Sequence, residues 1–231
     1  MRFYSIITCV LCMLASAAFG SSLIMSRRAD KDVAANTDPD SAFWSGIPAI
    51  FPEKDNFGKK TEGFRTEIRS RWTKSNLYFL FICPYRELHL KPNPQVDAET
   101  QGLWNWDVAE VFIGSNFVNI RKYREFEVSP QGEWTDLDIN LDAPNHEDGW
   151  VWNSGFEVSA RIDPIARRWY GLMRIPYSAV DTRSASAGNR LRVNFFLSEG
   201  RTPRHISIAW QATHESTFHV PLAFGILQLA R

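Results

Sequence analysis

The residues of this chain that could recognise a ligand are concentrated in residues 103–114. Trp104 and Trp106 come directly before a stretch of alternating side chains, and Glu110 interrupts the apolar pattern of that stretch. A buried carboxylate is costly unless it is paired or hydrogen-bonded, so Glu110 either has a partner or faces a solvated site. Indole rings beside such an acid suit a sugar, because the C–H faces of a sugar stack on aromatic rings while its hydroxyls need polar partners.

The same residues also fit a structural role. Two tryptophans can fill the end of a large core, and a single glutamate can form a salt bridge beside them. The pattern of residues 103–114 alone leaves both interpretations open.

Composition restricts the remaining classes of protein. The chain has 231 residues, of which 44% are hydrophobic and 13% aromatic, with 9 Trp and 16 Phe. Its 26 basic and 26 acidic residues cancel, so the net charge gives no support to nucleic-acid binding. The length is sufficient for one domain with a sizeable core, which we expect to be a monomer.

The chain divides into a leader, a short polar segment and a domain. Residues 1–20 begin with the basic Arg2 and continue as an apolar run that ends in small residues, which predicts a signal peptide. An uncleaved membrane anchor is the alternative, and no second apolar segment of spanning length follows. We expect residues 21–37 to be a linker or flexible entry and residues 38–231 to be the domain. The protein is then secreted, periplasmic or attached to the cell surface.

Cysteine use is consistent with an exported domain that depends on its core. Cys9 and Cys12 lie in the leader, which leaves only Cys83 in the mature chain. A single cysteine forms no internal disulfide, and Cys83 stands in a strongly apolar stretch, which favours a core position.

Alternating side chains and regular turn signals predict a domain made of strands. We expect one helical turn at residues 176–180 and no longer amphipathic helix. The fold class is therefore all-β, a two-sheet antiparallel β-sandwich of jelly-roll-like form. The predicted strands cover residues 66–72, 77–83, 108–113, 123–129, 133–140, 156–162, 168–175, 191–198, 205–211 and 222–229.

Several catalytic and metal-binding motifs are missing or incomplete. The chain has no Gly-x-Ser-x-Gly elbow and no glycine-rich phosphate loop after a strand. His214 and His219 are five positions apart, whereas a zinc-protease helix needs four. The acids Asp142, Glu147 and Asp148 indicate either a solvated loop or a loose calcium site.

Two other activities stay open. A glycan-active enzyme needs two carboxylates roughly 5 to 9.5 Å apart, and Glu110 with Glu125 or Glu127 is a candidate pair. A sandwich domain can also bind haem through Met and His, but Met173 alternates with apolar neighbours and fits a core position.

Three motifs resemble family 9 carbohydrate-binding modules. They are Trp-x-Trp-Asp-Val-Ala-Glu-Val-Phe-Ile-Gly at residues 104–114, Tyr-Arg-Glu-Phe-Glu-Val-Ser-Pro-x-Gly at 123–132, and Arg-Trp-Tyr-Gly-Leu-Met-Arg-Ile-Pro-Tyr at 168–177. The order of apolar and glycine positions in residues 209–227 is similar as well. The resemblance extends over roughly residues 38–230, and its order along the chain is more specific than any single motif.

This resemblance implies a non-catalytic β-sandwich that holds a small sugar, or the end of a glucan or xylan chain, between two tryptophans. Calcium, where the family has it, is structural, and no other cofactor is implied. Trp104 resembles the first sandwiching tryptophan and Trp210 the second, with Glu110 as an acceptor for a sugar hydroxyl. Trp106 can take the place of Trp104 because the two face the same way on an extended chain.

Two further residues match ligand-binding positions of the family. Arg124 resembles a hydrogen-bonding arginine, and Gln211 is a weaker match. Trp210 shares a predicted strand face with Ile206 and Ile208, so a core position is open for it too. A domain that kept the fold and lost the ligand is therefore a third hypothesis, besides sugar binding and glycan hydrolysis.

Overall fold

The computed structural model describes residues 22–201 and 205–231. The predicted signal peptide lies outside the described residues, as do Cys9 and Cys12. None of the described helices is both long and apolar enough to cross a membrane.

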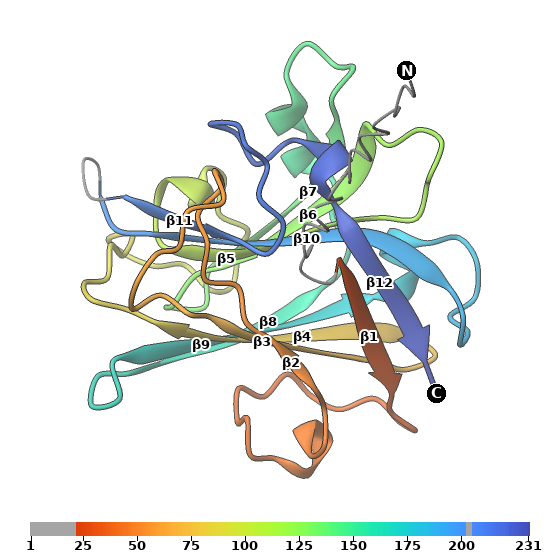
Figure 1. The fold of residues 1–231 in the computed structure, drawn as a ribbon, viewed down its shortest axis with the longest axis horizontal. Helices are drawn as coiled ribbons and strands as arrows, with labels where there is room; N and C mark the ends of the chain where they lie inside the picture. The colour runs from red at the N-terminus through yellow and green to blue at the C-terminus, as the bar shows by residue number, and fades with distance from the viewer. Residues whose placement is uncertain (1–21, 202–204) are drawn as a thin grey trace, which may run out of the picture.

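In the described part of the chain, twelve strands form a single mixed sheet (Figure 1). The strands are β1 (Leu23–Arg28), β2 (Ala49–Ile50), β3 (Glu67–Trp72), β4 (Asn76–Pro84), β5 (Val108–Gly114), β6 (Lys122–Val128), β7 (Trp134–Asn140), β8 (Glu157–Asp163), β9 (Arg168–Pro176), β10 (Arg190–Glu199), β11 (Ile206–Ala209) and β12 (Gly225–Ala230). The helical turns are η1 (Ala42–Trp44), η2 (Leu103–Asn105), η3 (His146–Val151), α1 (Tyr177–Val180) and η4 (Pro221–Ala223). The prediction of an all-β fold is confirmed, as is the helical turn expected at residues 176–180, whereas the turns η1 to η4 were not predicted.

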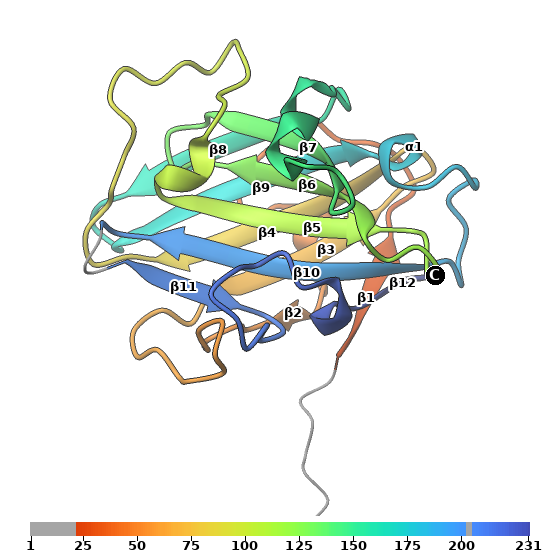
Figure 2. The ribbon, with the colours of Figure 1, turned by 90° about the horizontal axis from the view of Figure 1, so that it is seen from above.

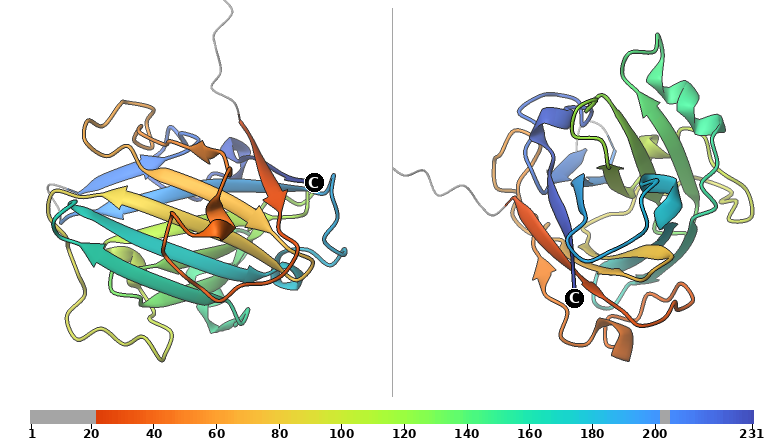
Figure 3. Two further views of the ribbon diagram at one scale, coloured as in Figure 1. Left: turned by 90° about the horizontal axis from the view of Figure 1, so that it is seen from below. Right: turned by 90° about the vertical axis from the view of Figure 1, so that its right-hand side faces the viewer.

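The sheet folds so that its two halves face each other, which corrects the predicted pair of separate antiparallel sheets. Strands β7, β6, β5 and β10 form one half, and β3, β4, β9 and β8 form the other. Between them β12 pairs with β10, and β1 pairs in parallel with both β12 and β3. This seam makes the sheet continuous because it supplies backbone partners to strands that would otherwise be edges. The end-on view in Figure 3 shows the sheet nearly closing on itself.

Strand β1 also corrects the predicted linker at residues 21–37. Leu23 is in register with Ile226 and Arg27 with Ala230, so this segment belongs to the sheet. Within it Ile24 and Ser26 are buried. The strand was not predicted because only two of its side chains enter the interior and its last two residues, Arg27 and Arg28, are charged.

The main core lies between the two halves. Strand β4 is covered on both faces, as predicted, and its Phe79 and Phe81 meet Phe195 of β10 edge-on. Cys83 is buried in the same cluster, which confirms its predicted core position. Because alternate residues of a strand point to opposite faces, the other side chains of β5, β6 and β10 project away from this core. They form the outer face described below.

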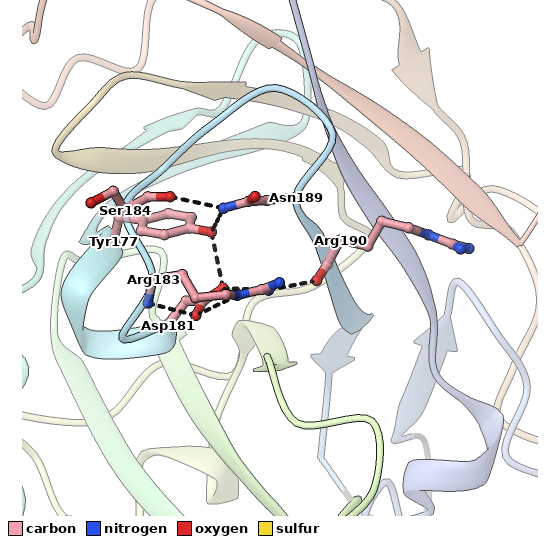
Figure 4. A network of polar contacts seen from close by, with 6 residues as sticks. All are labelled: Tyr177, Asp181, Arg183, Ser184, Asn189 and Arg190. Carbon is pink, nitrogen blue, oxygen red and sulfur yellow. Dashed lines mark hydrogen bonds and ion pairs between the residues drawn. The ribbon is translucent and has the colours of Figure 1, made fainter.

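A polar network fixes the connection between β9 and β10 (Figure 4). The Tyr177 hydroxyl donates to Asp181 Oδ2 at 3.1 Å, and Asn189 Nδ2 donates to the Tyr177 oxygen at 2.9 Å. Arg183 Nη2 donates to Asp181 Oδ2 at 2.7 Å. The ion pair and hydrogen bonds hold the pKa of the Asp181 carboxyl below its ordinary value, so this acid is ionised at neutral pH.

Candidate functional site

The outer face of β5, β6 and β10 forms the floor of a cavity of about 270 Å³. Antiparallel pairing sets Glu110 opposite Glu127 and Phe112 opposite Glu125, so these side chains share one face. Ser198 of β10 adds a hydroxyl to the same floor. Figure 2 shows these strands side by side, with η3 lying across β7.

Aromatic rings form the sides of the cavity. Trp104, from η2, is half-buried and lines it. Phe218, from the segment between β11 and β12, also lines it and is stacked on Phe196 with ring centroids 4.2 Å apart and planes 6° apart. Since Phe196 supports the Phe218 ring from behind, this side of the cavity is held in one orientation.

Three glutamates form a cluster, of which Glu110 and Glu125 line the floor and Glu127 lies buried beside them. Glu110, Glu125 and Glu127 are 2%, 3% and 0% exposed, and one carboxylate oxygen of each lies within 4.8 Å of the other two. Ser198 Oγ donates to Glu110 Oε1 at 3.2 Å. Burial raises the pKa of Glu125 to about 7. Burial, and secondarily a neighbouring carboxylate, raises the pKa of Glu110 and of Glu127 well above the ordinary value.

A histidine faces these acids without neutralising them. His219 Nδ1 is 2.7 Å from the Tyr123 hydroxyl, and its Nε2 is 3.9 Å from Glu125 Oε2. Burial and the nearby His146 ring lower the pKa of His219 to about 3, so its imidazole is uncharged at neutral pH. The floor therefore combines buried carboxyls with a neutral ring nitrogen.

The structure brings together two of the predicted site residues. Trp104 and Glu110 line the same cavity, as expected if both contact one ligand. Trp106 is not part of the cavity lining, and its ring packs against His89 at 4.5 Å. Arg124 is not part of the cavity lining either. It forms an ion pair with Asp138, and its Cζ lies 4.5 Å from the centroid of the Trp152 ring.

Trp210 lies on the other side of the sheet, and Gln211 is not part of the cavity lining. The Trp210 ring is 5.8 Å from Phe195, which belongs to the main core, and it covers Gly225 so closely that a Cβ there would be 2.5 Å away. Gln211 is held through its backbone, with Asn194 Nδ2 donating to its carbonyl at 2.9 Å. The predicted pairing of Trp104 with Trp210 is therefore wrong in this structure, since Phe195 and the cavity-side Phe196 project from opposite faces.

Some residues of the site were not singled out from the sequence. Phe218 was not proposed as a site residue, and His219 was considered only with His214 as an incomplete zinc motif, although both Phe218 and His219 line the cavity. Asp107 connects two distant segments, since its carboxylate accepts from the backbone N–H groups of His89 at 2.7 Å and Gly200 at 2.6 Å. An acid directly before a strand was the available signal for such a bridging role.

The other predicted metal ligands do not assemble. Asp142 forms an ion pair with Arg121, and Asp148 accepts from Asn145 at 2.9 Å. His214 packs beside Gly58 and is not part of the cavity lining, which includes His219. Across residues 22–201 and 205–231, only the three clustered glutamates form a group with the spacing of metal ligands.

Comparison with known proteins agrees with this architecture. Residues 38–231 match the model of a family described as carbohydrate family 9 binding domain-like. The chain belongs to this family, which confirms the resemblance seen in its motifs. It is also 25% identical over 173 residues to an extracellular protein of Arthroderma benhamiae, covering 69% of this chain and 76% of that protein.

Two solved structures share the fold. One is a family 9 carbohydrate-binding module of Caldicellulosiruptor kristjanssonii in complex with cellotriose, at 15% identity and a TM-score of 0.64, covering 90% of this chain and 93% of that one. The other is from Bacteroides uniformis, at 15% identity and a TM-score of 0.69, covering 91% of this chain and 100% of that one. At these identities the likeness establishes the fold.

Proposed function

We propose that this chain is a non-catalytic carbohydrate-binding domain whose ligand occupies the cavity beside Trp104. The observation that carries the proposal is the composition of that cavity, which has aromatic sides and a polar floor. A sugar ring can stack on Trp104 or Phe218. The Glu110 carboxylate can accept hydrogen bonds from the sugar hydroxyls, and the Ser198 hydroxyl can donate to them or accept from them. Membership of the family, and the cellotriose complex of the Caldicellulosiruptor module, support the same function.

The size of the cavity favours a small sugar or the terminal unit of a glucan or xylan chain. Its volume of about 270 Å³ is slightly below the common range for ligand sites, about 300–1,000 Å³. A long stretch of polysaccharide would need an open groove, so we infer that the domain recognises chain ends.

The arrangement of the acids favours binding over hydrolysis. A glycosidase places its two carboxyls on either side of the scissile bond, about 5–9.5 Å apart. Glu110 and Glu125 instead project from the same face of the sheet, and one carboxylate oxygen of Glu110 lies within 4.8 Å of one of Glu125. Both carboxyls would therefore meet the ligand from the same side.

Calorimetric titration with glucose, cello-oligosaccharides and xylo-oligosaccharides tests this proposal. We expect saturable binding to the wild type and at least tenfold weaker binding to Trp104→Ala, because a stacked indole contributes about 1.5 kcal/mol. Chromatography of the same mixtures should show no shortened product. An unchanged affinity for Trp104→Ala would overturn the site, and release of products would overturn the non-catalytic assignment.

Trp210→Ala is expected to lower stability and to leave oligosaccharide affinity nearly unchanged, unlike Trp104→Ala. Since the ring packs on Phe195 and Gly225, its removal should lower the free energy of unfolding by about 3 kcal/mol. Affinity for the same oligosaccharides should stay within about twofold of the wild type, because the indole is not part of the cavity lining. Urea denaturation measures the free energy of unfolding, and calorimetry measures the affinity. A loss of affinity at unchanged stability would show that Trp210 contacts the sugar.

We also propose that residues 1–20 direct the domain out of the cytosol as a monomer. The amino-terminal pattern and the description of the Arthroderma relative as extracellular support export. Amino-terminal sequencing of the protein recovered outside the cell would test cleavage near residue 20.

A further inference from the structure

The carbohydrate site leaves one buried acid unexplained. Glu127 does not line the cavity and is 0% exposed. Neither of its carboxylate oxygens accepts a hydrogen bond from a donor group, and its one polar neighbour is the Glu125 carboxyl, with which it can share a proton. Glu125 Oε2 is likewise buried without a hydrogen-bond partner. A buried carboxylate without donors is costly, so the structure requires something that compensates this oxygen-rich space.

No cationic side chain in the described ranges supplies that compensation. Within residues 22–201 and 205–231, no lysine or arginine forms an ion pair with the three glutamates, and the only ion-pair contact is His219 with Glu125 at 3.9 Å. Arg124 belongs to the same strand but pairs with Asp138. Arg192 is occupied by the backbone carbonyl oxygens of Ile120 and Pro221. The compensating charge must therefore come from bound protons or from a bound ion.

The spacing of the oxygens matches the coordination sphere of a metal ion. Calcium–oxygen distances are about 2.3–2.6 Å, so two ligand oxygens of one ion are at most about 5.2 Å apart. One oxygen each from Glu110, Glu125 and Glu127 satisfies this limit, since all three lie within 4.8 Å of one another. The adjoining cavity gives access to water molecules that can complete the sphere.

We propose that Glu110, Glu125 and Glu127 bind a divalent cation of the oxygen-preferring class, Ca²⁺ or Mn²⁺, at the floor of the cavity. Three carboxylates suit these ions, whereas a thiolate- or imidazole-rich set would favour copper or zinc. Antiparallel pairing of β5 with β6 holds Glu110 and Glu127 opposite each other, so most of the site is formed before the ion arrives. The site does not depend on sugar binding, because its ligands are all supplied by the chain and water.

Titration of the metal alone tests the proposal. The mature protein is stripped with EDTA, dialysed near neutral pH and titrated calorimetrically with CaCl₂ and with MnCl₂. We expect saturable binding of at least one of the two ions at one site per chain, and a rise in melting temperature on its addition. Glu127→Gln preserves the size of the side chain but removes a charged ligand, so its metal affinity should fall at least about tenfold.

The matched control is another buried glutamate with an unpartnered oxygen. Glu199 is 2% exposed and its Oε2 lacks a partner, but it stands outside the cluster. Glu199→Gln should bind the metal within about twofold of the wild type. Absence of saturable binding of both ions to the wild type would overturn the proposal, as would an equal loss of affinity in Glu199→Gln and Glu127→Gln.

A second variant keeps the test decisive if Glu127→Gln does not fold. Glu125→Gln removes a different ligand of the same cluster, and its metal affinity should fall by a similar factor. Titrating glucose and cello-oligosaccharides in EDTA separates this proposal from the carbohydrate site. Sugar binding without metal binding would overturn only the proposed cation site. Metal binding without sugar binding would overturn only the proposed carbohydrate function.

Discussion

Gly149→Ala is expected to disrupt the cavity and to lower the free energy of unfolding by about 1–3 kcal/mol. A Cβ on Gly149 would lie 2.3 Å from the carbonyl oxygen of Asp138 and 2.8 Å from its carbonyl carbon. Both atoms belong to the backbone of β7, so η3 must move instead. Because η3 carries His146 and Glu147 into the cavity lining, its displacement should also weaken oligosaccharide binding about tenfold or more.

Urea denaturation and calorimetry measure these two effects of Gly149→Ala. The control is Val151→Ala, a truncation in the same helical turn at a side chain that is 77% exposed. It should leave stability within about 0.5 kcal/mol of the wild type and affinity unchanged. Wild-type stability and affinity in Gly149→Ala would show that η3 does not need its close contact with β7.

The protein is expected to lose stability as the pH rises from about 4.5 to about 8. Burial, with a smaller effect of the Asp107 carboxylate, raises the pKa of Glu199 from 4.5 to about 8. Burial similarly raises the pKa of Asp107 to about 6. The folded protein thus retains protons that the unfolded chain has released, and each such group lowers the free energy of unfolding by about 1.4 kcal/mol per pH unit within its window.

Urea denaturation between about pH 5 and about pH 8, in EDTA so that no cation contributes, measures this dependence. Glu199→Gln should make the profile less steep, because glutamine does not titrate, while the raised pKa values of Glu110, Glu125 and Glu127 maintain the rest of the slope. Glu157→Gln, at an exposed acid of β8, should keep the slope of the wild type. A stability that rises through this pH range would contradict the expectation.

Most of the fold could be predicted because its strands alternate strongly. The β5 and β6 strands appeared in the sequence within one or two residues of their observed bounds, and the fully apolar β4 was correctly expected to be covered on both faces. Local patterns cannot show which distant strands pair. The parallel seam of β1 with β12 joins opposite ends of the chain, so the single continuous sheet was not predictable from periodicity.

The site was predictable only where alternation applies. Glu110 lies within β5, and its face follows from the period of two. Arg124 alternates with Glu125 on β6, so the two could not both point into one cavity. Trp210 lies one residue beyond the end of β11 and points to the same core as Ile206 and Ile208, so the alternation that left a core position open for it was the better guide than the family motif. The clustering of Glu127 with Glu110 needed the register between strands.

The seam between β1 and β12 has a consequence for the speed of folding. Each half of the sheet contains hairpins of neighbouring strands, whereas the seam joins Leu23 to Ile226 and must wait until nearly the whole chain is confined. Contacts between such distant residues form late, because the entropy of closing the intervening loop is lost before the pairing compensates it. The two halves should therefore form early and remain open to each other, and the meeting of the first and last strands should be the slow step.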